Sequence, residues 1–255
     1  MKKMLLLLLT ALLLNVGAAP ALAENKLYEL PELNLTLEIP EGMLVFTRHM
    51  AEDDIALMAM GMTPEELRKD FTEKDVYMNA MSLNPIYEVI VTMMEYEGSQ
   101  EIFDFNTLGD RKLKEMAELL LEGKAAQGKN FLYDSYRIEE KDKGKFMVLD
   151  LRQEAGGNTI YGRQYYTIFN GQAINITLQS YTGPISQEMT DTMQGIMDSL
   201  RFTAVFENPN KGAGIAKWVL AGLTATAALA GLGMILTSKR RQKQEEEAAG
   251  GAAAK

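Results

Sequence analysis

The chain has 255 residues, a formal net charge of −9 and no cysteine. The lack of Cys excludes disulfides, thiol nucleophiles and thiolate metal sites, so an exported domain must be stable from its hydrophobic core alone. Acidic residues dominate residues 24–210, where 17 Lys and Arg stand against 32 Asp and Glu and leave a net charge of −15, which makes nucleic acid an unfavourable partner.

The first 23 residues have the pattern of a cleaved signal peptide. Two lysines precede an apolar run over residues 4–14, and Ala21, Leu22 and Ala23 form the small-x-small pattern of a cleavage site. The run is too short to span a bilayer comfortably, so we expect the mature chain to begin at Glu24. An uncleaved anchor is the alternative, because the same charges and apolar run would serve both roles.

An alternating stretch at residues 33–39 predicts the first strand, half-buried and ended by Pro40. Its buried face is expected to consist of Leu33, Leu35, Leu37 and Ile39. The short stretch 44–48 is expected to pair with this strand across a turn at residues 41–42.

A methionine-rich stretch follows at residues 55–62. It is apolar on both faces of an extended chain, with Met58, Met60 and Met62 opposite Ile55, Leu57 and Ala59. We therefore predict a strand inside a sheet that is covered on both faces. The next four residues predict a helix start, with Thr63 as N-cap, Pro64 at the first helical position and Glu66 completing a capping box.

The rest of the folded domain is predicted to contain two strands, a helix, four strands and a final helix. These elements are expected at residues 76–83, 86–96, 109–122, 131–140, 145–154, 158–169, 172–181 and 184–200. Asn170-Gly171 is a strong signal for a two-residue hairpin turn. The order predicts an α+β fold, with an antiparallel sheet and helices on both faces in a three-layer α/β/α sandwich.

The C-terminal region predicts one transmembrane helix. Residues 218–236 are 19 residues without a charge, close to the ~20 that a helix needs to cross a bilayer. A basic flank with four Lys and Arg follows directly, which places the tail in the cytoplasm. The predicted organisation is a signal peptide (1–23), an extracytoplasmic domain (24–206), a linker (207–214), a transmembrane helix (215–237) and a cytoplasmic tail (238–255).

These features predict a single-pass protein of the bacterial cell membrane, in a Gram-positive organism, with its large domain outside. Small residues recur in the predicted membrane helix at spacings that allow close helix approach and hence a homodimer. They are Gly222, Thr226, Ala227, Ala230 and Gly231.

The order of elements resembles the PsbP-like family. The residues that carry the resemblance are the closing stretch "GRQYYTIFNGQAINITLQSYTGPISQEMTDTMQGIMDSLRF", a hairpin with an aromatic first strand followed by a terminal helix that ends in "DSLRF". The resemblance implies a binding or assembly module without catalysis. No functional residue carries over from it, and the predicted C-terminal membrane helix departs from the soluble members.

Candidate chemistry is sparse. His49 is the only histidine and is expected to be an exposed loop residue, with a pH-sensitive contact as the alternative. Paired carboxylates such as Asp53-Asp54 or Glu139-Glu140 would suit a hydrolase, but no further signature accompanies them. Seven methionines could converge and offer thioethers to Cu(I), although core packing is favoured. They are Met58, Met60, Met62, Met78, Met81, Met93 and Met94.

The favoured function is a membrane-anchored extracytoplasmic binding or scaffold module without catalytic activity, acting on a protein partner of unknown identity. The alternatives are a ligand or soft-metal receptor built on the Met-rich strands, which includes a Met-lined groove for a partner's helix, and a carboxylate-dependent hydrolase. No residue is assigned as catalytic, cofactor-binding or metal-binding, and no cofactor is expected.

Overall fold

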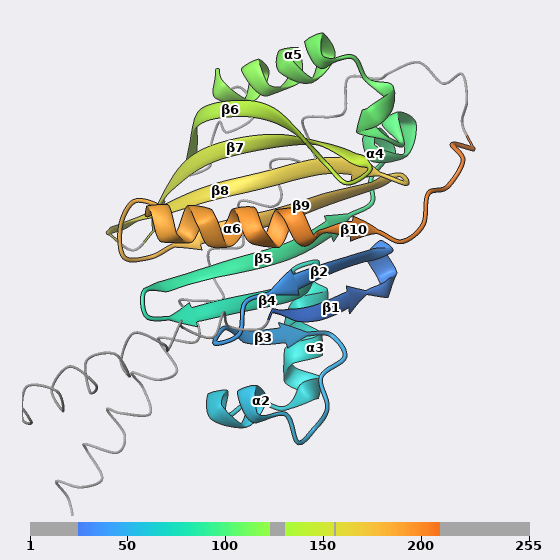
Figure 1. Cartoon of the computed structure of the whole chain (residues 1–255). Coiled ribbons are helices and arrows are strands. Elements are labelled where there is room, and N and C mark those ends of the chain that lie inside the picture. Colours follow the sequence, from blue (N-terminus) through green and yellow to red (C-terminus); the bar gives the residue numbers. More distant parts are fainter. Residues whose placement is uncertain (1–24, 123–130, 156, 210–255) are drawn as a thin grey trace, which may run out of the picture.

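The computed structural model describes residues 25–122, 131–155 and 157–209 (Figure 1). Within them, seven strands form one antiparallel sheet in the order β3-β4-β5-β9-β8-β7-β6, and a smaller sheet has the order β1-β2-β10. The strands are β1 Lys26–Leu30, β2 Leu35–Ile39, β3 Leu44–Thr47, β4 Val76–Leu83, β5 Ile86–Met94, β6 Phe131–Lys141, β7 Gly144–Ala155, β8 Asn158–Phe169, β9 Gln172–Ser180 and β10 Arg201–Phe202.

Five α-helices and two short 3-10 turns complete the described part of the fold. They are η1 Pro31–Leu33, α2 Ile55–Met60, α3 Pro64–Glu73, α4 Glu97–Ile102, η2 Phe105–Thr107, α5 Asp110–Leu121 and α6 Gln187–Ser199. The predicted α+β class with a large antiparallel sheet is therefore confirmed. The α4 helix and the η2 turn were not predicted.

Local signals in the sequence explain most of these elements. Thr63 accepts a hydrogen bond from the Glu66 backbone N–H, and the Glu66 side chain accepts one from the Thr63 N–H, so the predicted capping box is confirmed. The β8–β9 hairpin turns at Asn170 and Gly171, whose φ angles of 55° and 79° suit a type I′ turn.

The prediction for residues 55–62 is wrong, because this stretch forms the short helix α2. The Asp54 side chain accepts a hydrogen bond from the Ala56 N–H at 2.8 Å and caps the helix start. Gly61 ends it in the left-handed region at φ 62°. Ala, Leu and Met are good helix formers, so the capping residues at each end outweigh an alternation that also fits a strand.

The predicted partner of the first strand is also wrong. β3, which contains most of the stretch 44–48, pairs with β4 at the edge of the large sheet. β2 pairs instead with β1 and with β10, far away in sequence. The alternating pattern correctly buries Leu35, Leu37 and Ile39, but it carries no information about which strand lies alongside.

Hydrophobic clusters lie on both faces of the large sheet. On one face α6 and the small sheet pack against alternate residues of the central strands, such as Val89 and Ile176. On the opposite face α2 and α3 pack over Phe46 and Ile90, while α5 and the α4–η2 segment pack over β6, β7 and β8. We call these the α6 face and the α3 face.

No helix in the described part of the chain is long and apolar enough to cross a membrane. The predicted signal peptide and transmembrane helix lie outside the described residues.

Candidate functional site

The methionines of the two strands do not converge on one face, so the Cu(I) alternative gains no support, whereas Met78, Met81 and Met93 are buried as the favoured core packing expects. Met78 and Met93 belong to the core of the α6 face, with 0% and 8% of their surface exposed. Side chains alternate along a strand. Met81 lies three positions from Met78 on β4, and Met94 lies one position from Met93 on β5, so Met81 and Met94 point to the opposite face. Among the described residues, no group of three or more His, Asp or Glu side chains is placed to hold a metal ion.

The Met-rich helix α2 creates a different feature at the surface. Its Leu57 is buried at 1% exposure and packs with α3, whereas Met58 is 61% exposed. Next to α2, the segment before it and the start of α3 enclose an open groove of about 810 Å³. We call it the Met groove; it is lined by Met50, Ala51, Glu52, Met62, Thr63, Pro64, Glu65 and Arg68.

The walls of the Met groove are held in place by backbone geometry. Met62 sits in the tight connection between α2 and α3, where its N–H donates to the Leu57 carbonyl at 3.2 Å. The other wall follows Arg48, whose guanidinium donates to the Val76 carbonyl at 2.6 Å and lies 3.7 Å from the centre of the Tyr77 ring. Met50 and Met62 are themselves partly buried against the hydrophobic cluster under α3.

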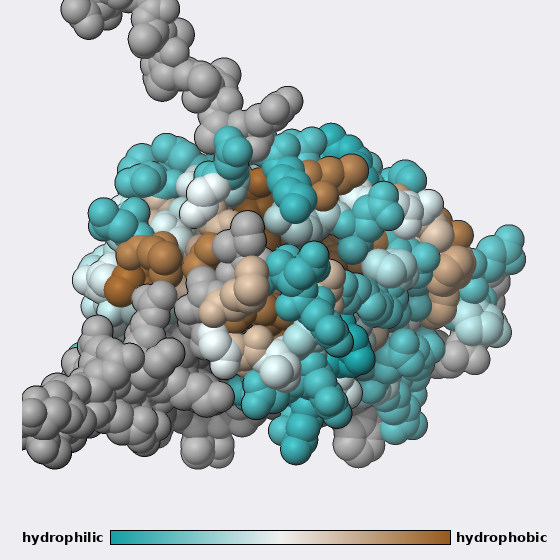
Figure 2. All heavy atoms as spheres, turned by 90° about the horizontal axis from the view of Figure 1, so that it is seen from below, coloured by the Kyte–Doolittle hydropathy of each residue, from teal (hydrophilic) through white to brown (hydrophobic). Residues whose placement is uncertain are grey.

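The Met groove combines apolar side chains with negative charge. Figure 2 views the molecule from the α2–α3 end and shows apolar atoms open to solvent among polar ones. Residues 50–66 contain five Asp and Glu and no Lys or Arg. Two of these acids, Glu52 and Glu65, line the groove, where Arg68 is the one cationic lining residue. The charged lining residues of the groove are thus two acids and one base, a small excess of negative charge.

A second unusual feature is a row of polar side chains on the α3 face, which we call the polar strip. It crosses β4, β5, β9 and β8 through directly paired positions, for example Glu88 opposite Gln179 and Thr92 opposite Asn175. Its members are Asn79, Glu88, Thr92, Gln164, Asn175, Thr177 and Gln179. The strip belongs to neither of the hydrophobic clusters on that face.

Glu88 is the ionisable member of the strip and is fully buried at 0% exposure. Burial raises the pKa of its carboxyl group, against hydrogen bonds from the Tyr181 hydroxyl and from Asn79 Nδ2, the latter at 2.7 Å. Burial, and then the neighbouring Glu88, also raise the pKa of Tyr181. Three buried polar atoms of the strip make no hydrogen bond to any described residue: Asn79 Oδ1, Thr92 Oγ1 and Asn175 Nδ2.

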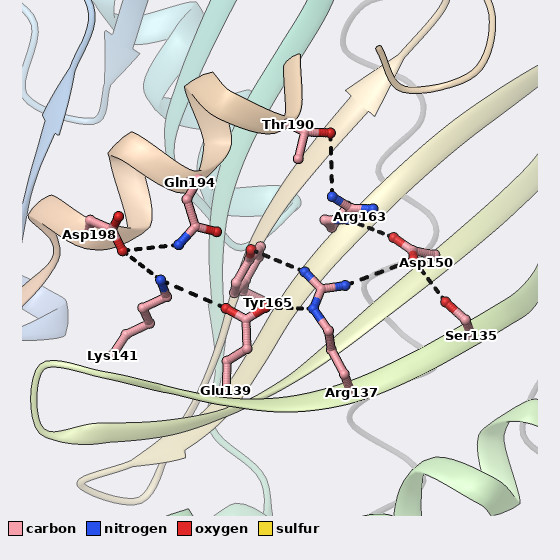
Figure 3. Close-up of polar contacts among 10 residues, drawn as sticks. All are labelled: Ser135, Arg137, Glu139, Lys141, Asp150, Arg163, Tyr165, Thr190, Gln194 and Asp198. Atoms are coloured by element: carbon pink, nitrogen blue, oxygen red, sulfur yellow. Dashed lines mark hydrogen bonds and ion pairs between the residues drawn. The ribbon is translucent and has the colours of Figure 1, made fainter. Parts of the chain in front are cut away.

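The α6 face carries a contrasting network of ion pairs (Figure 3). Asp150 accepts hydrogen bonds from Arg163 Nε at 2.7 Å and from Ser135 at 2.8 Å. Lys141 contacts Asp198 of α6 at 2.5 Å, and Glu139 contacts Arg137 at 2.5 Å. Each charge in this network has an opposite partner, so the network fastens α6 to strands β6, β7 and β8.

The candidate catalytic groups are placed in structural roles. His49 is exposed and its Nε2 lies 2.6 Å from a carboxylate oxygen of Glu32. Asp54 caps α2, and Glu139 is paired with Arg137. Glu139 and its neighbour Glu140 are adjacent on β6, so their side chains point to opposite faces. The Glu139-Glu140 pair therefore lacks the geometry of two acids acting on one substrate.

Sequence reasoning missed Met50 as a groove residue and Glu88 as a buried acid. A signal for Glu88 was present, because it is a lone carboxylate within the apolar strand "IYEVIVTMM". Met50 carried no such signal, since it lies outside every predicted element.

Comparisons with known proteins match no family model and no curated protein. Among solved structures, cyanobacterial PsbP from Synechocystis sp. PCC 6803 matches with 13% identity, 72% of this chain and 96% of that chain covered, and a TM-score of 0.41. LpqN of Mycobacterium tuberculosis, described as involved in cell envelope biogenesis, matches with 9% identity, 67% and 83% covered, and a TM-score of 0.38.

A protein of unknown function from Pseudomonas aeruginosa, PA94, matches with 14% identity, 73% of this chain and 99% of that chain covered, and a TM-score of 0.32. A PsbP structure is thus among those that resemble this chain, as the closing stretch of the sequence predicts. Likenesses of this size carry no functional argument, so function has to be argued from the residues.

Proposed function

We propose that this chain is a membrane-anchored extracytoplasmic binding or scaffold module without catalytic activity, and that it receives a protein partner at the Met groove. The anchoring and the location rest on the signal-peptide and membrane-helix patterns of the sequence. The proposal includes the three-layer α/β/α arrangement, which leaves the groove at one end of the α3 face.

The observation that carries the proposal is the Met groove itself. A groove of about 810 Å³ with Met50 and Met62 in its walls is large enough to take several apolar side chains of a partner. Methionine is unbranched and polarisable, so a surface rich in it adapts to different partner shapes. The charged groups of the α6 face, by contrast, are paired with one another and leave few charges for a partner to bind.

The test is crosslinking on intact cells that express the full chain, followed by identification of crosslinked proteins. We expect capture of the same partner in repeated experiments, and loss of capture when the groove carries Glu52→Lys and Glu65→Lys. The matched control is Glu140→Lys with Glu188→Lys, an equal charge change at exposed positions on β6 and α6. Recovery of the protein alone, or equal capture by both double variants, would contradict the proposal.

A further inference from the structure

The chemistry of the Met groove limits what kind of segment fits it. The thioether and methyl groups of Met50 and Met62 and the ring methylenes of Pro64 favour apolar side chains in the groove. Glu52, Glu65 and Arg68 are the charged lining residues, and the segment 50–66 supplies three further acids and no base. The excess of acids therefore favours an occupant that is apolar on one side and positively charged on the other.

A helix with an apolar stripe and a basic face has this distribution. Its residues at i, i+3, i+4 and i+7 form one row that enters a groove, while Lys and Arg on either side reach the carboxylates. The part of α3 that lines the groove runs from Pro64 to Arg68 and gives a wall of about 7 Å, which matches one to two turns of such a helix.

Other occupants are disfavoured by charge. A second copy of the exported domain brings its own net charge of −15, and phosphate groups of nucleic acid or anionic lipid are repelled by the same carboxylates. From this we propose that the Met groove binds a basic, amphipathic helical segment of a partner protein. The inference rests on the proposed function and specifies its partner.

Binding of a synthetic peptide to the full chain tests the inference directly. The protein is placed in nanodiscs of zwitterionic lipid, and the probe is a fluorescent 18-residue helix of Leu and Lys with one apolar stripe. Empty nanodiscs give the lipid background, and a Leu and Glu peptide of the same pattern is the charge control. We expect saturable binding of the Lys peptide only, weakened at least tenfold between low and high salt, because screening reduces charge attraction.

Variants of the groove locate the site. Glu52→Gln with Glu65→Gln is expected to weaken binding about tenfold at low salt and to reduce its salt dependence. Glu140→Gln with Glu188→Gln, the matched control away from the groove, should leave binding unchanged. Met62→Gln, which replaces the thioether by an amide of similar size, should weaken binding at every salt concentration. Thermal unfolding checks that each variant is folded; the two acidic positions are exposed, so their variants keep the test valid if Met62→Gln unfolds.

Several outcomes would overturn the inference: no saturable binding of the Lys peptide, equal binding of the Glu peptide, or equal affinity in the groove and control variants. Concentration-dependent self-association that needs the groove would identify a second copy as the occupant instead. If cells yield a groove-dependent partner but the Lys peptide does not bind, the proposed function stands and this inference fails. If neither experiment shows groove-dependent binding, both fail.

Discussion

Helices α6 and α2, which pack on opposite faces of the large sheet, use methionine in different ways. On the α6 face, Met189, Met193 and Met197 of α6 are at most 3% exposed and fill the core. On the α3 face, Met58 is 61% exposed and Met50 and Met62 line an open groove. The position of the helix, and not the presence of methionine, decides whether these side chains are core or surface.

The two faces also differ in how completely their polar groups find hydrogen-bond partners. The ion pairs around Asp150 and Asp198 satisfy each other on the α6 face (Figure 3). The polar strip of the α3 face buries Glu88 and leaves atoms of Asn79, Thr92 and Asn175 without a hydrogen bond to a described residue. Buried polar atoms without partners lower stability, so the α6 face is the better satisfied one, and the α3 face is where we place binding.

The sharpest test of this contrast truncates one methionine on each face. Met197→Ala should lower the free energy of unfolding by about 2–5 kcal/mol, because it leaves a cavity in the core. Met58→Ala should change it by less than about 0.5 kcal/mol, since the side chain is exposed. Urea unfolding followed by circular dichroism measures both. Similar losses in the two variants would show that α2 is packed as tightly as α6.

Removing the central carboxylate of the ion-pair network tests the α6 face. Burial works against the Asp150 carboxylate, but hydrogen bonds from Arg163 and Ser135 outweigh it and hold the pKa of Asp150 below its ordinary value of 3.8. Its contribution to stability is therefore present above that value and is lost as the pH falls through the lowered pKa. Asp150→Asn should cost about 1–2 kcal/mol at pH 7.

The control for Asp150→Asn is the same comparison at about pH 3, where the difference from the unmodified protein should shrink. A loss of stability that is equal at both pH values would mean that the charge of Asp150 is not what holds the network together.

Two glycines provide a matched pair on opposite faces. Gly61 ends α2 at φ 62°, and a Cβ there meets no atom within 4 Å, so Gly61→Ala should cost about 1–2 kcal/mol from backbone strain alone. Gly195 lies inside α6, with equally open space around its Cβ, and Gly195→Ala should stabilise the protein by about 0.5–1 kcal/mol. Thermal unfolding measures the change in stability of both variants. If both variants were stabilised, Gly61 would not have the left-handed conformation that ends α2.

The smallest change is expected from Glu88→Gln, and its sign is opposite to that of Asp150→Asn. The pKa of Glu88 is raised above its ordinary value of 4.5. The protonated carboxyl group therefore contributes to stability at low pH, and this contribution is lost as the pH rises through the raised pKa. Gln stays neutral and can still accept a hydrogen bond from Tyr181, and it can donate to Asn79 Oδ1 once the Asn79 amide has turned round. We expect a higher unfolding temperature at pH 7.5 and no gain at pH 4.

The pH series for Glu88→Gln should be read beside that for Asp150→Asn. If Glu88→Gln lowers the unfolding temperature at pH 7.5, the carboxylate is charged and stabilising in place, and the polar strip would then be a satisfied structural cluster like the one under α6.

Local patterns in the sequence determined much of this fold. The capping box at Thr63 and Glu66, the hairpin at Asn170 and the buried stripe of α6 were all predictable, because each depends on residues close together in the chain. The same patterns could not separate helix from strand at residues 55–62, where a short apolar run fits both periods.

Only the tertiary structure decided which strands lie side by side and which side chains meet. β2 finds its partners in β1 and β10, and the Met groove joins Met50 to Met62 across an intervening helix. Glu88 meets Tyr181, which lies far along the chain just after β9, because β9 pairs with β5. Such contacts depend on long-range packing, which the spacing of residues in one stretch does not encode.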